Sequence, residues 1–489
     1  MQTPKDHPLS LVKTKIVATV GPASADATMI RELIGSGVDI FRLNFAHGTH
    51  EWLANVLGHI RSISKELESP IGVLGDLSGP KIRLGELPEG GVECRESAEF
   101  YFGRSEKPDQ ENWLTCTYEQ LIDDVQPDDR ILLADGMVGM RVVEKHADYV
   151  KCIVEQSGRI RSRQGVNLPG VALSTPSLTE KDRDDLQWAL ENELDFVGLS
   201  FVRSADDVTM LRDAIAEHPS GHEPFIISKI EKTEAIDELE SILDVTDGIM
   251  VARGDLGVEA DITQVPILQK KIIALCNLHR IPVITATQML DSMQDNDLPT
   301  RAEATDVANA VLDGTDAVML SGETAIGVHP ARCVRMMDQI ASNAEELVLP
   351  TPRADSASRP GRRALPVTEA VALGAVGAAD QLAAKLIVVA SHSGRTAMAF
   401  SKQRSHTPVV ALSDNPKTAR RMCLFWGVTS LHSEAAAHGV SQLTVRIDEW
   451  GLRNGILSNG DRVVLVGKAH GKAAGHDMML IHTVNQNPT

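Results

Sequence analysis

Two segments of the sequence combine charged side chains with the spacing expected of a buried site. In Ser228–Glu231, residues two apart point to the same side of an extended strand, so Lys229 and Glu231 share one face. In Arg253–Gly257, Asp255 stands among glycines whose backbone amides can approach an anion closely. The two carboxylates form an oxygen-only pair that prefers Mg²⁺ or Mn²⁺ and leaves coordination positions for substrate oxygens. The sequence therefore predicts one divalent ion beside a lysine.

Two further residues supply groups that bind phosphate or carboxylate. Thr287 follows the apolar run Val283–Ala286, and Arg42 lies near the end of the run Ile40–Leu43. A hydroxyl and a planar guanidinium at such positions can hold either anion. A lysine, an arginine and a divalent ion together predict phosphoryl transfer, in which the protein mainly positions the reactants and offsets charge on the transferring group.

Each of these residues also has a purely structural interpretation. Lys229 and Glu231 could form a surface ion pair, and Asp255 could cap the next helix. Their joint position at the ends of predicted strands favours the catalytic interpretation, because barrel cores otherwise hold branched apolar residues there.

The elements that must position these groups are short apolar runs, each followed by an amphipathic stretch. This is the pattern of βα units with buried parallel strands. Eight runs predict a closed (β/α)₈ barrel, with a doubly wound open sheet as the alternative. The runs are Lys15–Val20, Ile40–Leu43, Ile71–Leu74, Phe196–Leu199, Phe225–Ser228, Gly248–Val251, Val283–Ala286 and Ala317–Leu320. For the first helix we expect Ser24 as the N-cap and an end at Gly35 to Gly37.

A separate domain is expected between the third and fourth runs. Roughly 120 residues separate Leu74 from Phe196, far more than one helical crossover needs. The insert looks β-rich and could act as a lid. Its strand candidates are Arg141–Val143, Tyr149–Val154 and Ile160–Ser162, and Gln156–Gly158 is expected to be a hairpin turn between the last two.

The remainder of the chain predicts a linker and a third domain. Four prolines within Leu349–Pro366 stop regular structure, and helix and strand alternation returns from Val367 onward, as in a smaller α/β domain. The expected division is a barrel at 1–75 and 173–348, a lid at 76–172, a linker at 349–366 and a C-terminal effector-binding domain at 367–489.

The third domain contains a second candidate site after its predicted first strand, Leu386–Ala390. Hydroxyls, free amides at a helix start and one arginine can surround a phosphate, although a plain N-capped turn would use the same residues. The residues concerned are Ser391, Ser393, Gly394, Arg395 and Thr396.

Composition sets limits on the function. The chain has 489 residues and a formal net charge of −19, which argues against a broad nucleic-acid or anionic-membrane surface. Its 6 cysteines lie far apart without a C-x-x-C pair, so neither a zinc site nor a disulfide framework is expected. The N-terminal residues show no apolar signal region, and no apolar stretch is long enough to span a bilayer. We therefore expect a cytoplasmic protein.

Several motifs resemble, in the same order, those of the pyruvate kinase family over nearly the whole chain. They are Thr14–Pro22, Phe41–Gly48, Ile227–Glu231, Met250–Gly257 and Leu320–Ala325. The resemblance implies a (β/α)₈ barrel, a lid inserted after the third strand, a C-terminal α/β regulatory domain and a homotetramer. The implied reaction, the last step of glycolysis, transfers the phosphoryl group of phosphoenolpyruvate to ADP, giving ATP and enolpyruvate, which is then protonated to pyruvate.

The resemblance also implies roles for individual residues. Lys229 would neutralise the transferring phosphoryl group and Arg42 would clamp it. Glu231 and Asp255 would be ligands of Mg²⁺ or Mn²⁺, and the amides of Gly254 and Asp255 with Thr287 would bind the substrate carboxylate. Thr287 and Ser321 would be candidates near the protonated carbon. Arg83 and Lys181 would lie on the nucleotide side.

The chain departs from the family pattern where many members bind K⁺. Asn44 and Asp76 match, but Ala46 replaces a serine and Lys81 replaces a glutamate. Family members that do not need K⁺ carry lysine at this position, so the resemblance predicts K⁺-independent activity. A solvated Lys81 beside a weaker K⁺ site is the alternative.

The segment Ser391–Thr396 resembles the family's effector phosphate loop, which implies activation by a sugar phosphate or a nucleoside monophosphate. Two other functions remain open. A metal-dependent barrel lyase or aldolase acting on pyruvate would also use a Glu/Asp metal pair, but it would not need Arg83 and Lys181. A catalytically silent, effector-binding paralogue could dispense with Lys229.

Overall fold

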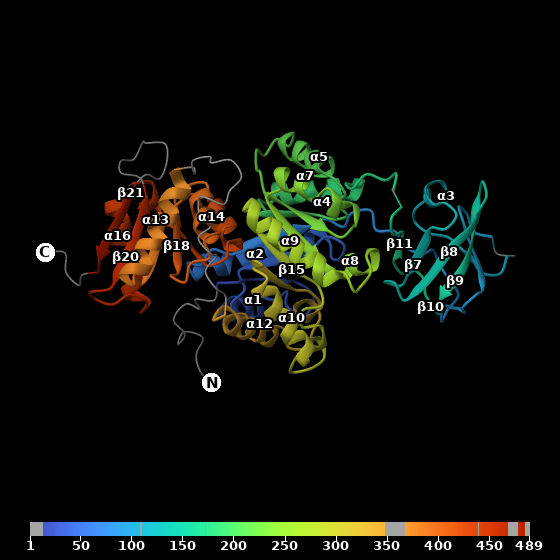
Figure 1. Ribbon diagram of the computed structural model, residues 1–489, viewed down its shortest axis with the longest axis horizontal. Helices are drawn as coiled ribbons and strands as arrows, with labels where there is room; N and C mark the ends of the chain where they lie inside the picture. The colour runs from blue at the N-terminus through green and yellow to red at the C-terminus, as the bar shows by residue number, and fades with distance from the viewer. Residues whose placement is uncertain are drawn as a thin grey trace. The chain divides into compact units, whose positions relative to one another are not determined.

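A computed structural model describes residues 13–107, 110–171, 173–347, 367–438, 440–467 and 478–484 (Figure 1). Eight parallel strands close into a barrel in the order β1-β16-β15-β14-β13-β12-β3-β2, which confirms the barrel over the open sheet. The strands are β1 (Lys15–Thr19), β2 (Ile40–Asn44), β3 (Gly72–Asp76), β12 (Phe196–Leu199), β13 (Phe225–Ile230), β14 (Gly248–Ala252), β15 (Val283–Ala286) and β16 (Ala317–Leu320). Every strand except β2 and β13 is buried throughout, as continuous apolar runs predict.

Helices of the barrel bury an apolar stripe against these strands. In α2 (His50–Glu66) the buried residues Leu53, Val56, Leu57, Ile60 and Ile63 recur at helical spacing. The other helical segments are α1 (Ala27–Gly35), α4 (Glu180–Glu191), α5 (Ala205–Ala216), α6 (Glu234–Asp237), α7 (Leu239–Val245), α8 (Arg253–Glu259), α9 (Val265–His279), η1 (Asp291–Gln294), α10 (Arg301–Leu312), α11 (Gly322–Ala325) and α12 (Pro330–Glu345).

The predicted N-cap of α1 is wrong by two residues. Asp26 caps the helix, because its side chain accepts hydrogen bonds from the amides of Thr28 and Met29. Ser24 is buried instead, and its hydroxyl accepts from the Gly21 amide in the preceding turn. Both residue types cap helices well, so sequence alone does not choose between them.

An aspartate precedes every second strand of the barrel. Each carboxylate accepts a hydrogen bond from the backbone amide near the start of the preceding strand. The pairs are Asp39 with Ile16 (2.9 Å), Asp195 with Val73 (2.9 Å), Asp247 with Ile226 (3.0 Å) and Asp316 with Val283 (2.8 Å). The repeat fixes the amino ends of the strands, opposite to the ends from which the candidate site residues project.

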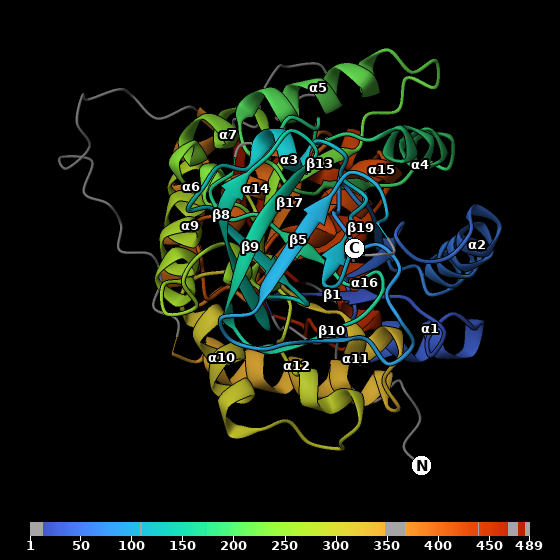
Figure 2. The ribbon, with the colours of Figure 1, turned by 90° about the vertical axis from the view of Figure 1, so that its right-hand side faces the viewer.

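The predicted insert after β3 is a β domain with its own core (Figure 1). A six-stranded sheet has the order β11-β7-β8-β9-β5-β6, and Figure 2 shows β8, β9 and β5 side by side. The elements are β4 (Val92–Cys94), β5 (Glu99–Gly103), β6 (Trp113–Leu114), α3 (Leu121–Asp124), β7 (Arg130–Leu133), β8 (Val138–Lys145), β9 (Tyr149–Gln156), β10 (Gly158–Ile160) and β11 (Val166–Asn167).

The predicted hairpin at Gln156–Gly158 is wrong. β10 pairs with β4 in a separate two-stranded sheet, and β9 pairs with β8 and β5. The Gln156 side chain instead donates to the carbonyl oxygens of Gly136 and Met137, which holds the end of β9 against the segment that leads into β8. The chain therefore changes sheets where a tight turn was expected.

The C-terminal α/β domain is confirmed. Its sheet has the order β19-β18-β17-β20-β21, parallel except for the antiparallel β21. The elements are α13 (Val367–Leu382), β17 (Leu386–Ala390), α14 (Arg395–Ser401), β18 (Val409–Ser413), α15 (Pro416–Arg421), η2 (Met422–Leu424), β19 (Val428–His432), η3 (Glu434–Ala437), α16 (Val440–Arg453), β20 (Arg462–Gly467) and β21 (Met478–Thr483). The linker expected at 349–366 lies outside the described residues.

Buried ion pairs attach this domain to two of the repeated aspartates. Lys402 and Arg404, which follow α14, lie 2.6 Å and 3.0 Å from the Asp316 carboxylate. Arg420 of α15 lies 2.6 Å from Asp195. Both aspartate side chains are fully buried, so these contacts are shielded from solvent.

The chain divides into two compact units. One contains residues 76–191 and 198–272, and the other contains the residues up to 75, residues 192–197 and those from 273 onward. The candidate site residues are described below within each unit.

Candidate active site

Strand β13 brings Lys229 and Glu231 together, as period-2 geometry predicts. The Lys229 ammonium nitrogen lies 2.9 Å from Glu231 Oε1 and 3.5 Å from Asp76 Oδ1. It also donates to Ser200 Oγ at 2.7 Å, and that hydroxyl donates to the Leu77 carbonyl oxygen at 2.7 Å. The lysine side chain is 11% exposed, so its charge faces few water molecules.

Glu231 is a buried carboxylate held from two sides. Its Oε2 accepts a hydrogen bond from the Phe201 amide at 2.7 Å, while Oε1 faces Lys229. Burial raises the pKa of Glu231, the Lys229 ammonium opposes this rise, and the Asp255 carboxylate adds to it. The Asp255 carboxylate thus contributes to the electrostatic surroundings of Glu231.

Phe201, whose amide binds Glu231, has a strained backbone conformation. Phe201 has φ = 55°, in the left-handed region that bulky residues rarely adopt. Gly79 makes room for its ring, because a Cβ at position 79 would lie 2.7 Å from a carbon of that ring. Strained residues of this kind cluster at functional sites, where surrounding structure holds them.

Asp255 lies in the first turn of α8, which begins directly after β14 ends at Ala252. The donor set fits a hard divalent ion, because the two carboxylates offer only oxygen atoms. Among the described residues, no group of three or more His, Cys, Asp or Glu side chains could hold a metal. Two carboxylate ligands would leave the other coordination positions of such an ion to substrate and water.

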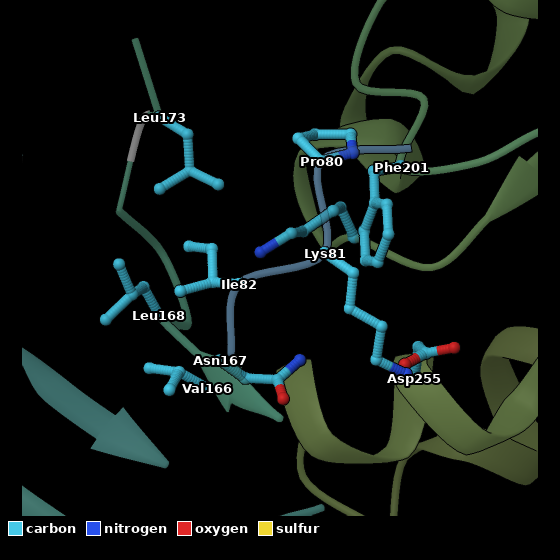
Figure 3. A pocket seen from close by; sticks show the side chains of 10 residues that line it. Pro80, Lys81, Ile82, Val166, Asn167, Leu168, Leu173, Phe201 and Asp255 are labelled. Atoms are coloured by element: carbon cyan, nitrogen blue, oxygen red, sulfur yellow. The ribbon is translucent and has the colours of Figure 1, made fainter. Parts of the chain in front are cut away.

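Asp76 and Lys81 belong to the predicted monovalent-cation region. Asp76 is buried and forms the ion pair with Lys229. A Cβ at Gly198 would lie 2.8 Å from Asp76 Oδ1, so only glycine leaves room for this carboxylate. Lys81 is exposed and lines a pocket with Phe201 and Asp255 (Figure 3). Within the part of the chain that the structure describes, its ammonium forms no ion pair.

The two nucleotide-side candidates, Arg83 and Lys181, contact different residues of this unit. Arg83 donates to the carbonyl oxygen of Arg163 at 3.2 Å. Lys181 lies in the first turn of α4 and pairs with Asp185 at 2.5 Å, with a side chain that is 56% exposed.

In the other unit, three candidates lie on or directly after barrel strands. Arg42 on β2 donates to Thr19 Oγ1 at 3.1 Å. Thr287 follows β15 with φ = 71° and donates to the Ala286 carbonyl oxygen. Asn44, the last residue of β2, accepts from the Ala46 amide at 3.1 Å.

Ser321 is held by a carboxylate that the sequence analysis missed. The Ser321 amide donates to Glu323 Oε2 at 2.7 Å, and the Leu290 amide donates to Glu323 Oε1 at 3.0 Å. Burial raises the pKa of Glu323, and these amides oppose the rise. Glu323 therefore joins the segment after β15, which contains Thr287, to the segment after β16.

Ser200 and Phe201 were also missed, although a signal for them exists. They directly follow the predicted strand Phe196–Leu199, and strand ends were the places where functional groups were expected. A serine and a phenylalanine carry no charge, so only their position could have identified them.

The phosphate-loop candidates lie between β17 and α14. Gly394, the N-cap of α14, has φ = 83°, and Arg395 donates from Nε to Ser393 Oγ at 3.3 Å. Ser391 and Thr396 are buried. The Ser391 hydroxyl has no hydrogen-bond partner among the described residues, so a donor and acceptor group stays available there.

None of the helices in the described ranges is both long and apolar enough to cross a membrane.

Family models match two parts of the chain, "Pyruvate kinase, barrel domain" at residues 11–334 and "Pyruvate kinase, alpha/beta domain" at residues 369–482.

Relatives match over almost the whole length. The pyruvate kinase of Geobacillus stearothermophilus is 39% identical over 97% of this chain and 80% of its own, and that of Staphylococcus aureus strain MRSA252 is 40% identical over 96% and 80%. The crystal structure of a pyruvate kinase from Cryptosporidium parvum superposes with a TM-score of 0.90, at 35% identity over 98% of this chain and 97% of that one. These matches, together with the barrel and its clustered strand-end residues, show that the chain belongs to the pyruvate kinase family and is a phosphotransferase.

Proposed function

We propose that this pyruvate kinase transfers the phosphoryl group of phosphoenolpyruvate to ADP with Lys229 as the cation that stabilises the transferring group. The proposal rests mainly on the position of the Lys229 ammonium, which is nearly buried and contacts Glu231, Asp76 and Ser200. A preorganised cation in a water-poor site stabilises negative charge far better than one in bulk water.

The reaction breaks the bond between phosphorus and the enol oxygen, and a terminal phosphate oxygen of ADP forms the new bond to phosphorus. The enolate that is released then takes a proton at carbon. Glu231 and Asp255 would hold the divalent ion, which supplies positive charge and oxygen coordination when bound. Lys229 offsets charge on the same group, so the protein mainly positions and neutralises the reactants.

Other residues take supporting roles in this proposal. Arg42 clamps the phosphate, and Thr287 and Ser321 are the candidates near the carbon that is protonated. The amides of Gly254 and Asp255 bind the substrate carboxylate. On the nucleotide side, the proposal assigns Arg83 and Lys181, whose cations suit the phosphates of ADP.

An assay of the purified protein tests this function directly. Pyruvate should form only when phosphoenolpyruvate, ADP and Mg²⁺ are all present, with one ATP for each pyruvate. Pyruvate formation without ADP would favour the lyase or aldolase interpretation. No turnover, with phosphorylated metabolites still bound, would favour the silent paralogue.

The proposal includes activity without K⁺. Ala46 lacks the side-chain oxygen that a serine would offer to a monovalent cation, and Lys81 adds a tethered positive charge where many family members have a glutamate. An ammonium group can supply the charge of a monovalent ion.

A phosphorylated metabolite is the proposed activator, bound by the loop Ser391–Thr396, and the proposed assembly is a homotetramer. The buried Ser391 hydroxyl, which has no partner among the described residues, supports a polar ligand at this loop. Coupling between two sites is reciprocal, so phosphoenolpyruvate should tighten the activator by the same factor.

A further inference from the structure

A buried ion pair joins the two segments that carry the metal-ligand candidates. The Lys232 ammonium lies 2.7 Å from Glu259 Oε1, and the two side chains are 4% and 1% exposed. Lys232 directly follows Glu231, and Glu259 ends the helix α8 whose first turn contains Asp255. The pair therefore fixes the backbone that carries one carboxylate to the backbone that carries the other.

The inserted domain reaches the same carboxylate. Asn167 donates from Nδ2 to Glu259 Oε1 at 3.3 Å. Asn167 ends β11, which pairs with β7 in the six-stranded sheet, so its position follows that of the whole domain. Figure 3 shows Asn167 and Asp255 lining one pocket, and Lys232 lines it as well.

Burial of the Glu259 carboxylate costs free energy, so the contacts that offset this cost are important for its position. Burial raises the pKa of Glu259, and Lys232 and Asn167 oppose the rise. Its Oε2 has no hydrogen-bond partner among the described residues. Because half of the carboxylate is unsatisfied, the Lys232 and Asn167 contacts supply most of what compensates for its burial.

We propose that Glu259 couples the inserted domain to the metal site, with Asn167, Glu259 and Lys232 acting as positioning residues. This inference rests on the proposed binding of the divalent ion by Glu231 and Asp255. An ion that orders these two segments strengthens the contact of Glu259 with Asn167, and docking of the inserted domain in turn strengthens metal binding. The two effects must be equal in free energy.

Asn167→Ala is the informative variant. It removes the contact of the inserted domain but leaves Lys232 paired with Glu259, so no buried charge loses its partner. Contacts of the segment that directly follows the inserted domain also remain, because Arg203 donates to the carbonyl oxygens of Leu173 and Thr175. Gln156→Ala is the matched control, since Gln156 is also a side-chain amide but donates only within the inserted domain.

Two measurements on the full-length protein without substrates test the coupling. Mn²⁺ affinity is measured by the loss of the free-ion signal in electron paramagnetic resonance, and hydrogen exchange of residues 164–168 is measured with and without Mg²⁺. In the unchanged protein Mg²⁺ should slow exchange in this segment. Asn167→Ala should abolish that protection and weaken Mn²⁺ binding by about fivefold or more, the lower end of usual coupling between sites.

Three other outcomes are decisive. Unchanged Mn²⁺ affinity and Mg²⁺ protection in Asn167→Ala would overturn the coupling, and so would an equal loss in Gln156→Ala, because it would show a general loosening of the inserted domain. Glu231→Gln separates this inference from the metal assignment. If that variant binds Mn²⁺ as the unchanged protein does, the metal assignment itself is wrong.

Discussion

The Lys229 ammonium on strand β13 lies 2.9 Å from Oε1 of Glu231, the residue that directly follows the end of this strand at Ile230. The pair thus places a cation and a metal-ligand candidate side by side in surroundings that exclude most water. Removing the cation should affect the reaction much more than the fold, because Glu231 keeps its hydrogen bond from Phe201.

Lys229→Met should therefore lower kcat by about 10²–10³-fold, the usual cost of losing one preorganised charge-stabilising group. The melting temperature is measured in Mg²⁺, and a moderate decrease is expected because the buried Asp76 and Glu231 carboxylates lose their ammonium partner. Arg212→Met is the control, because Arg212 pairs with Asp247 at an exposed position of the barrel. An unchanged kcat in Lys229→Met would exclude the proposed mechanism.

Activity should persist when K⁺ is replaced by tetramethylammonium at equal ionic strength. Lys81→Ala should then lose activity in tetramethylammonium and recover part of it in K⁺, because a free cation replaces the missing ammonium. Steady-state rates in the two salts provide the measurement. Full turnover in K⁺ that disappears in tetramethylammonium would contradict K⁺ independence.

Arg395→Ala should abolish activation by phosphorylated metabolites without changing the rate at saturating phosphoenolpyruvate. The guanidinium is the one fixed positive charge in the Ser391–Thr396 loop, and phosphate binding depends strongly on such a group. Fructose 1,6-bisphosphate, glucose 6-phosphate, ribose 5-phosphate and AMP would each be titrated against substrate saturation. Activation by none of them in the unchanged protein would remove the proposed site.

Asp316→Ala should destabilise the protein strongly, because it leaves the buried Lys402 and Arg404 without their carboxylate. Breaking a buried ion pair in this way costs about 3–5 kcal/mol. Asp247→Ala is a matched control, since this aspartate has the same position in the barrel repeat but its partner Arg212 is 46% exposed. Thermal unfolding should show a clearly larger decrease for Asp316→Ala, and equal decreases would refute the argument.

Glu303 should make stability depend on pH. Burial alone would raise its pKa, but hydrogen bonds from Ser292 and Thr300 outweigh this effect and lower it. A lowered pKa stabilises the folded state above the ordinary glutamate value, about 4.3, and this contribution is lost as pH falls through the lower folded value.

Glu303→Gln should therefore unfold at a lower temperature at pH 7, with a local loss of roughly 0.5–2 kcal/mol as for other helix caps. The difference from the unchanged protein should shrink as pH falls from 5 to 3. Thermal unfolding of both proteins across this range is the measurement. A difference that stays constant with pH would show that the carboxylate charge contributes nothing.

The barrel was predictable because buried parallel strands read as continuous apolar runs, and six of the eight predicted strand ranges agree with the structure to within one residue at each end. Lys229 and Glu231 were predictable for a similar reason, since strand periodicity acts over two residues. The helix cap at Asp26 and the change of sheet after Gln156 could not be predicted from the sequence. Nearby residues cap helices equally well, and tertiary pairing decides which sheet a strand joins.

Contacts between distant parts of the chain were beyond sequence reasoning. The Ser200 hydroxyl and the Phe201 amide meet the residues of β13 only once the barrel closes. Asn167 and Glu259 lie 92 positions apart, and neither belongs to a motif that would join them. Such pairs need three-dimensional structure, because local propensity contains no information about them.

Removal of the C-terminal domain would affect the aspartates that precede β12 and β16. Asp195 and Asp316 are neutralised by Arg420, Lys402 and Arg404, which all come from the C-terminal domain. Excision of that domain would leave Asp195 with Arg61 alone, 2.8 Å away, and would leave Asp316 without Lys402 and Arg404 on a newly uncovered rim. A free-standing catalytic fragment would therefore require redesign of Asp316, for example to asparagine, before it could be expected to stay in solution.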